Sequence, residues 1–173
     1  YSNAIVGQVY YNSTTGQFKS VADGGAPIGT WASVSNMNSA RTGLAPAQAG
    51  TRTLSLAFGG ETPGGNSALT ESWNGSAWTE TGDLNQVRQS LAGAGTYTSA
   101  LAFGGLISSG TGETEEFNGS SWSEQNDLNS PRYGLKGAGV QTAALAFAGT
   151  TGSFTGVTES WNGSSWTEVT DIN

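Results

Sequence analysis

Residues 91–105 read LAGAGTYTSALAFGG, and residues 114–129 read TEEFNGSSWSEQNDLN. The same two phrases return further along the chain, as LKGAGVQTAALAFAG at 135–149 and TESWNGSSWTEVTDIN at 158–173. Short apolar runs between glycine, asparagine, serine and threonine are typical of strands joined by turns. The two copies therefore indicate a repeated all-β unit.

A looser copy precedes them, with TLSLAFGG at 53–60 and TESWNGSAWTETGDLN at 70–85. The tryptophans shared by the three copies, Trp78, Trp122 and Trp166, lie 44 residues apart. A period of about 20–50 residues is typical of stacked or circular arrays of small units. We therefore divide this part of the chain into repeat units 39–85, 86–129 and 130–173.

Each unit is predicted to form four antiparallel strands, and the last unit is the clearest. Residues 135–139 form a first strand of small residues, and the uninterrupted apolar run at 143–148 predicts a strand buried on both faces. Residues 158–169 predict a hairpin with a two-residue turn at Asn162 and Gly163. Asn-Gly favours a type I′ turn, in which both central residues have positive φ.

This turn predicts which side chains of the hairpin face each other. With a two-residue loop, Trp161 lies opposite Ser164 and Glu159 opposite Trp166, so the two tryptophans are diagonal neighbours on one face. The same pairing is expected in the other copies. Each unit thus presents an aromatic pair on one face: Trp73 with Trp78, Phe117 with Trp122, and Trp161 with Trp166.

The composition argues against several classes of function. The sequence contains no cysteine and no histidine, which removes disulfides, thiolate sites and the commonest general base. The formal charge of −7 argues against nucleic acid as a partner, and no apolar run approaches the ~18 residues that membrane insertion requires. The remaining carboxylates recur with the repeat, which favours a structural role. We therefore expect no enzyme, no cofactor and no metal site.

A four-stranded sheet with one aromatic face cannot bury that face alone, so the units are predicted to stack radially as a β-propeller. The small first strands, LAGAG and LKGAG, would let neighbouring sheets approach near the axis. The LAFGG segments at 56–60 and 101–105, the aromatic pairs and the arginines between units resemble kelch repeats, although the third unit has Ala148 for the first glycine. This resemblance covers residues 31–173. It implies kelch-like four-stranded antiparallel blades and an interaction module.

Residues 1–30 differ from the repeats and form a separate region. GQVYYNSTTGQFKSV at 7–21 predicts a hairpin with strands near 8–11 and 17–21. Within it, GQVYYNSTTGQFK at 7–19 resembles segments of bacteriophage tail fibres and other virion proteins. Trp31 aligns with Trp78, so this region is either fibre-like or a degenerate first blade. Two architectures remain open on the sequence: a ring of about four units, or an open arc completed by partners.

The repeated positions have two interpretations each. The aromatic pairs could stack on sugars, but their spacing favours packing between blades. The arginines could line a binding face, but pairing with a repeated carboxylate is favoured, either with Glu71, Glu115 and Glu159 or with Asp83, Asp127 and Asp171. We take both sets as structural positions: Arg41, Arg88, Arg132, Trp73, Trp78, Phe117, Trp122, Trp161 and Trp166.

Recognition is expected where the copies differ, in the loops at 61–69, 106–113 and 150–157, because loops on a rigid frame are free to vary. The candidate ligand-binding residues are Glu61, Asn66, Leu106, Ile107 and Phe154. The expected function is a virion or extracellular structural or attachment module, partnered by other virion or surface proteins, by itself or by a cell-surface glycan. The alternative is a secreted, lectin-like propeller that binds glycans.

Overall fold

The computed structural model describes residues 9–12, 14, 16–20 and 33–172. The chain divides into two units, Tyr1–Val34 and Ser35–Asn173. In the first unit, β1 (Val9–Asn12) pairs antiparallel with β2 (Gln17–Ser20), which confirms the predicted hairpin. The connecting residues 21–32, and with them the proposed alignment of Trp31 with Trp78, lie outside the described residues.

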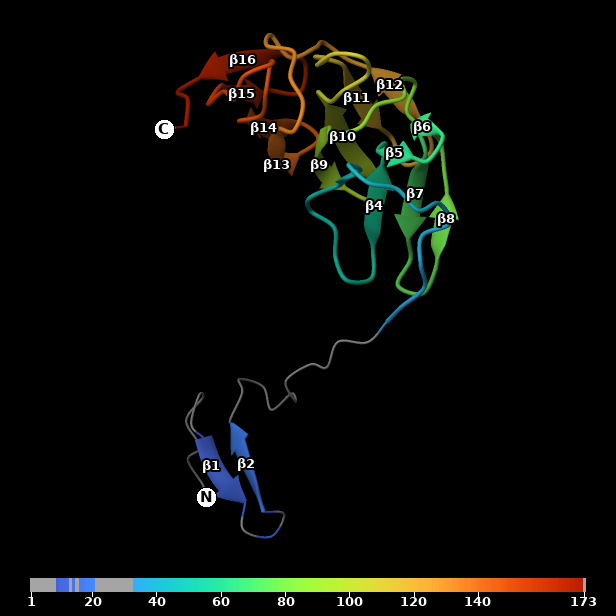
Figure 1. The fold of residues 1–173 in the computed structure, drawn as a ribbon, viewed down its shortest axis with the longest axis vertical. Coiled ribbons are helices and arrows are strands. Elements are labelled where there is room, and N and C mark those ends of the chain that lie inside the picture. The colour runs from blue at the N-terminus through green and yellow to red at the C-terminus, as the bar shows by residue number, and fades with distance from the viewer. Residues whose placement is uncertain (1–8, 13, 15, 21–32, 173) are drawn as a thin grey trace. The chain divides into compact units, whose positions relative to one another are not determined.

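In the second unit, all regular elements of the described residues are strands, and twelve of them form three four-stranded antiparallel sheets (Figure 1). Each sheet holds one repeat, as predicted. The first sheet contains β3 (Ala45–Pro46), β4 (Ser55–Phe58), β7 (Thr70–Trp73) and β8 (Trp78–Glu80); the second β9 (Ala92–Thr96), β10 (Ser99–Phe103), β11 (Thr114–Phe117) and β12 (Trp122–Glu124); the third β13 (Lys136–Val140), β14 (Ala143–Phe147), β15 (Thr158–Trp161) and β16 (Trp166–Val169). A small ribbon joins β5 (Glu61–Thr62) to β6 (Gly65–Asn66).

The sheets stack face to face in a propeller-like arrangement. The first strands β3, β9 and β13 of neighbouring sheets lie against one another, while β8, β12 and β16 form the opposite edges. One apolar core fills each of the two junctions, the first around Leu56 and Phe58, the second around Leu101 and Phe103. Alternate residues of each LAF segment point to opposite faces of its sheet. The first and second sheets therefore each offer a Leu and a Phe to the sheet that follows.

The close approach expected of the small first strands is present. A Cβ added to Gly93 would lie 2.5 Å from the Pro46 carbonyl oxygen and 2.6 Å from Phe58 Cζ, both in the preceding sheet. Gly137 has the same environment, 2.5 Å from the Gly93 carbonyl oxygen and 2.6 Å from Phe103 Cζ. Glycine at these positions is required by the neighbouring sheet.

The predicted two-residue hairpin turn is wrong. Trp161 pairs directly with Trp166, and the loop has four residues, from Asn162 to Ser165. Gly163 has a φ of 94°, but Asn162 is not among the residues with positive φ, so the turn is not type I′. The Asn162 side-chain oxygen accepts the backbone N–H of Ser164 and of Ser165, which stabilises the longer loop. The aromatic pair still shares one face, because it is directly opposite rather than diagonal.

The prediction that residues 143–148 are buried on both faces is also wrong, although it describes the equivalent strand β10 well. In β14, Ala144 and Ala146 are buried against the second sheet, whereas Leu145 is 42% exposed. Leu101, the equivalent residue of β10, is fully buried because the third sheet covers it. No described sheet covers the face of β14 that carries Leu145.

Candidate functional site

The repeated aromatic pairs fasten one sheet to the next. Phe58 packs on Trp122 with ring centroids 4.8 Å apart, and Phe103 packs on Trp166 at 4.9 Å. The Trp122 indole N–H donates to Thr70 Oγ1 of the preceding sheet at 3.0 Å. With 6% of its surface exposed, Trp122 cannot stack on a ligand. The aromatic pairs are therefore scaffold at both filled junctions.

The repeated arginines each form a buried ion pair with a glutamate of the same repeat. Arg41 Nη2 lies 2.9 Å from Glu71 Oε1, and the equivalent distances are 2.6 Å for Arg88–Glu115 and 2.5 Å for Arg132–Glu159. All six side chains are fully buried. The prediction of pairing with a carboxylate is confirmed, with glutamate as the partner. The aspartates instead accept backbone N–H groups: Asp83 from Thr70, Asp127 from Thr114 and Asp171 from Thr158.

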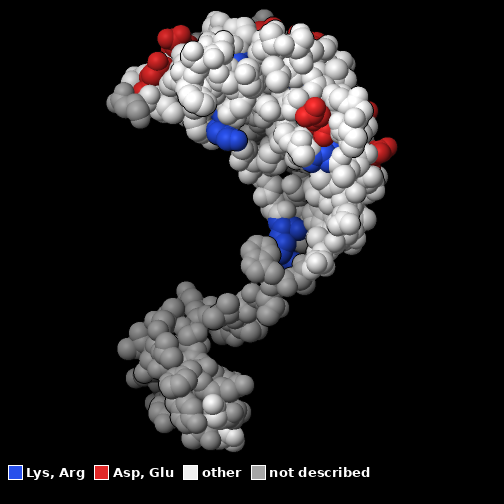
Figure 2. All heavy atoms as spheres, viewed as in Figure 1, with Lys and Arg blue, Asp and Glu red and all other residues white. Residues whose placement is uncertain are grey.

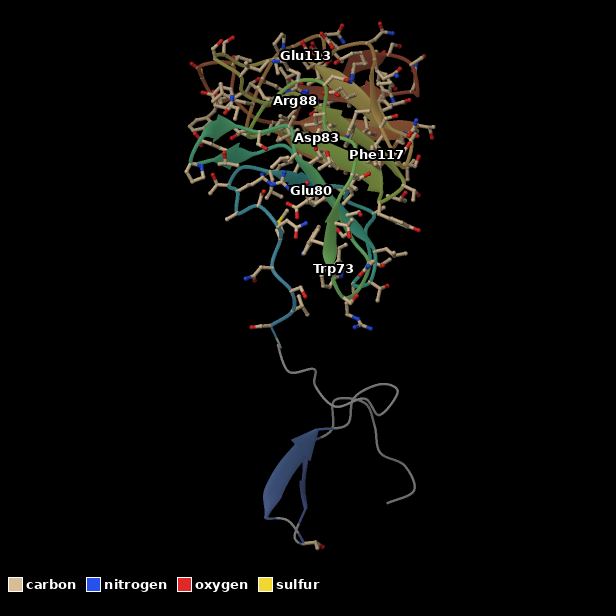
Figure 3. The ribbon with its side chains drawn as sticks, turned by 90° about the vertical axis from the view of Figure 1, so that its right-hand side faces the viewer. Trp73, Glu80, Asp83, Arg88, Glu113 and Phe117 are labelled. Atoms are coloured by element: carbon tan, nitrogen blue, oxygen red, sulfur yellow. The ribbon has the colours of Figure 1, made fainter. Side chains whose placement is uncertain are left out.

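The three arginines differ in how completely their donors are used. Arg132 donates to the carbonyl oxygens of Ser130, Ala146 and Ala148 in addition to Glu159. Arg88 is labelled in Figure 3 on the connection between the first two sheets, and its Nε and Nη2 find no hydrogen-bond partner among the described residues. Burial lowers the pKa of Arg41, although Glu71, its closest charged neighbour, acts in the opposite direction. Arg88 therefore relies more on its glutamate than Arg132 does, because Glu115 accepts its one short hydrogen bond.

The outer strands carry exposed acidic residues. Glu80, Glu124 and Glu168 lie in β8, β12 and β16, and acidic groups are visible as red spheres along the rim of the array in Figure 2. Partial burial and, second to it, the nearby carboxylate of Glu115, its cross-strand partner, together raise the pKa of Glu124 to about 7. Burial likewise raises the pKa of Glu116. These groups make the rim a poor surface for anionic partners.

A short segment before the first sheet repeats the contacts made at each junction. The Asn85 and Asn129 backbone N–H groups donate to Glu115 and Glu159 of the next sheet, each at 2.7 Å. The Asn38 backbone N–H donates to Glu71 of the first sheet at the same distance. Ser35 Oγ donates to the Ser76 carbonyl oxygen, as the Asn126 side chain does to Ser164. We call residues 35–38 the strap, because they occupy the place of the outer end of a preceding sheet.

Four of the five candidate ligand-binding residues lie together. Glu61 pairs with Asn66 across the ribbon β5–β6, and Asn66 Nδ2 donates to the carbonyl oxygens of Leu106 and Ile107 at 3.0 Å each. The loop of the first sheet is thus bonded to the loop of the second. All four residues are half-buried, so they are less available to a ligand than the sequence suggested.

Phe154, the fifth candidate, is 98% exposed in the loop of the third sheet. Bridges from Leu106 to Gly110 and from Thr150 to Phe154 correspond to the pairing of Glu61 with Asn66. Phe154 therefore occupies the position from which Asn66 contacts the following sheet. No described residue takes that place beside the third sheet, which accounts for the exposure of Phe154.

A depression of roughly 770 Å³ lies at the other end of the array, beside the first sheet. The lining comes from residues 40–42 and 61–65. Sequence analysis singled out Arg41 and Glu61 but did not predict the depression, because the sequence does not show that these two segments lie together. Glu61 and Thr62 are equivalent to Leu106 and Ile107, which Asn66 contacts in the second sheet. The depression is thus the place that the loop of a preceding sheet would fill.

The described residues contain no group of three or more acidic, histidine or cysteine side chains placed to hold a metal ion. None of their segments forms a helix long and apolar enough to cross a membrane. No family model matches the sequence, and no curated protein matches it significantly.

Proposed function

We propose that the chain is a non-enzymatic structural or attachment module of a virion or an extracellular surface, such as part of a phage tail fibre. Its partners are other virion or surface proteins, or a glycan of the cell surface. The proposal includes the assignment of the sheets to kelch-like blades. At the two filled junctions, the diglycines, the aromatic pairs and the arginines Arg88 and Arg132 that resemble that family lie at or beside the contact between sheets.

The observation that carries the proposal is the contrast between scaffold and loops. Trp122 and Trp166 pack between the sheets, and the ion pairs are buried within their own repeats, so neither set is available to a ligand. The loops that differ between copies stand on this frame, and the exposed Phe154 belongs to one of them. A rigid scaffold that presents unlike loops suits recognition of a surface. The fibre-like stretch at 7–19 supports the virion setting.

Binding to intact bacteria tests this proposal. The fluorescently labelled full chain is incubated with a panel of Gram-negative and Gram-positive strains, with and without periodate oxidation of their surface glycans. We expect strain-selective binding that falls at least about tenfold in Phe154→Ser, the loss expected of a contact residue at the centre of an interface. Val87→Ser, which removes an exposed valine outside the three loops, is the matched control.

Two results would contradict the proposal: binding to no strain in the panel, or equal binding by Phe154→Ser and the unmodified chain. Loss of binding after periodate oxidation would identify a glycan as the receptor. Binding that survives oxidation would identify a surface protein.

The lectin-like alternative expects one equivalent sugar site in each repeat. Flat tryptophan faces suit pyranose rings, but Trp122 and Trp166 are buried between sheets. The three loops also differ in sequence, so they do not form equivalent pockets. A calorimetric titration with a glycan purified from a bound strain would favour this alternative if it showed three equal sites per chain.

A further inference from the structure

The two filled junctions follow the same steric rule, which requires a glycine on each side. On the leading sheet, a Cβ added to Gly59 would lie 2.9 Å from the Arg88 carbonyl oxygen and 2.8 Å from Leu91 Cδ2 of the next sheet. Gly104 is equivalent, at 2.8 Å from the Arg132 carbonyl oxygen. On the following sheet, Gly93 and Gly137 are equally crowded by the sheet before them. Contacts below 3 Å force a shift of one sheet against the other.

Both glycines are replaced at the two faces that have no described neighbour. Ala148 takes the position of Gly59 and Gly104 and keeps their conformation, with a φ of 59° against 65° and 64°. Pro46 takes the position of Gly93 and Gly137: it pairs with Ala57 where they pair with Ala102 and Ala146. Glycine is thus present where a described sheet approaches and replaced where none of the described sheets does.

These two faces would otherwise fit each other in two copies of the chain. The face after the third sheet exposes apolar side chains, among them Val140, Leu145 and Phe154. The face before the first sheet carries Trp73 and Trp78 and the depression beside Glu61. Two different, complementary faces make a head-to-tail contact, and such a contact builds rings or open filaments. Unless such a contact is blocked, copies of the chain could add to one another without limit.

We infer that Pro46, Ala148 and the strap are steric stops, which prevent the third sheet of one copy from taking the first sheet of another in the geometry of the internal junctions. In that geometry the Ala148 methyl would overlap the Arg41 carbonyl oxygen and Leu44 of a second copy, the equivalents of Arg88 and Leu91. The Pro46 ring would meet Phe147, the equivalent of Phe58 and Phe103. The strap already occupies the place that the outer end of the arriving sheet would enter.

Each stop acts by a different contact, and together they protect the whole face. Forcing an extra methyl or ring into a packed junction lowers affinity by about tenfold or more at each site. The strap must additionally leave its hydrogen bonds to Ser76 and Glu71 before a second copy can dock. This inference concerns self-association only, so it is independent of the proposed role in a virion.

Sedimentation velocity of the full chain over a range of concentrations tests the stops. The stop-free variant combines Pro46→Gly and Ala148→Gly with Ser35→Ala and Asn38→Ala, which remove the side-chain hydrogen bonds of the strap to the Ser76 and Trp78 carbonyl oxygens. Its control keeps the two strap changes but carries Pro131→Gly and Ala77→Gly, at an exposed proline between β12 and β13 and an exposed alanine in the hairpin loop between β7 and β8. Chemical unfolding first verifies that both variants fold.

We expect one-chain mass for the unmodified protein and the control, and a mass that grows with concentration for the stop-free variant. Adding Leu145→Glu, which charges the face after the third sheet, is expected to return the stop-free variant to one-chain mass. A stop-free variant that stays at one-chain mass would overturn the inference. So would an unmodified chain that associates as tightly as the stop-free variant.

Discussion

At the scale of single residues, the buried ion pairs are the most demanding feature of this chain. Removing one partner of such a pair leaves an uncompensated buried charge, which costs about 3–5 kcal/mol. We expect Glu115→Gln to lower the free energy of unfolding by this amount, because no other acidic side chain of the described residues lies within hydrogen-bond distance of Arg88. Urea unfolding measures the change.

Two comparisons in the same experiment separate this effect from a general loss of packing. Glu159→Gln is expected to cost less than Glu115→Gln, because Arg132 keeps three carbonyl acceptors while Arg88 keeps only a long bond to Gln86. Glu116→Gln, in the same strand as Glu115, is expected to change stability by no more than about 0.5 kcal/mol. Equal losses in all three variants would contradict an ion-pair origin.

At the scale of elements, the outer hairpins depend on one asparagine side chain each. Asn118 Oδ1 accepts the backbone N–H groups of Ser120 and Ser121, both at 3.0 Å, and so closes the four-residue loop. We expect Asn118→Ala to lower the free energy of unfolding by about 1–2 kcal/mol, since each hydrogen bond contributes about 1 kcal/mol. Thermal unfolding provides the measurement.

Ser120→Ala is the control for this loop, because it removes only the exposed hydroxyl that bonds to Asn118. Its expected effect lies within about 0.5 kcal/mol. If Asn118→Ala were as mild as Ser120→Ala, the asparagine would not be what closes the loop, and the Asn-Gly pair would act through its backbone alone.

The same loop shows where sequence reasoning about elements succeeds and where it stops. The strands on either side, β11 and β12, follow from their apolar and aromatic pattern, and so does the pairing of Phe117 with Trp122 on one face. The loop length does not follow, because Asn-Gly favours both a two-residue turn and a side-chain-closed loop of four. The hydrogen bonds of the Asn118 side chain determine the loop length, and these bonds cannot be read from the sequence.

At the scale of the whole molecule, the repeat predicts the three sheets and their stacking, since each copy carries the same buried aromatics and ion pair. The repeat does not predict which sheet faces remain uncovered, because identical residues in different repeats have different surroundings. Leu101 is fully buried and Leu145 is 42% exposed, although both stand in an ALAF segment. The candidate loop residues show the same limit: Asn66 contacts the next sheet, whereas the equivalent Phe154 is exposed.

This difference in surroundings predicts unequal effects at Gly104 and Ala148, which share a left-handed backbone conformation with φ near 60°. A side chain in that conformation costs about 1–2 kcal/mol at either position. We expect Ala148→Gly to raise the free energy of unfolding by only about this backbone amount, because no described sheet approaches its methyl. Urea unfolding of both variants provides the comparison.

Gly104→Ala places the same methyl 2.8 Å from the Arg132 carbonyl oxygen and 2.9 Å from Leu135 Cδ2, inside a filled junction. Gly104→Ala is expected to lower the free energy of unfolding by the cost of the left-handed backbone and by a further ~1–3 kcal/mol for overpacking. The difference in free energy between this loss and the gain in Ala148→Gly measures the steric cost of a methyl group that faces a neighbouring sheet. If the two changes were equal in size, the face after the third sheet would be covered in solution as closely as the face after the second.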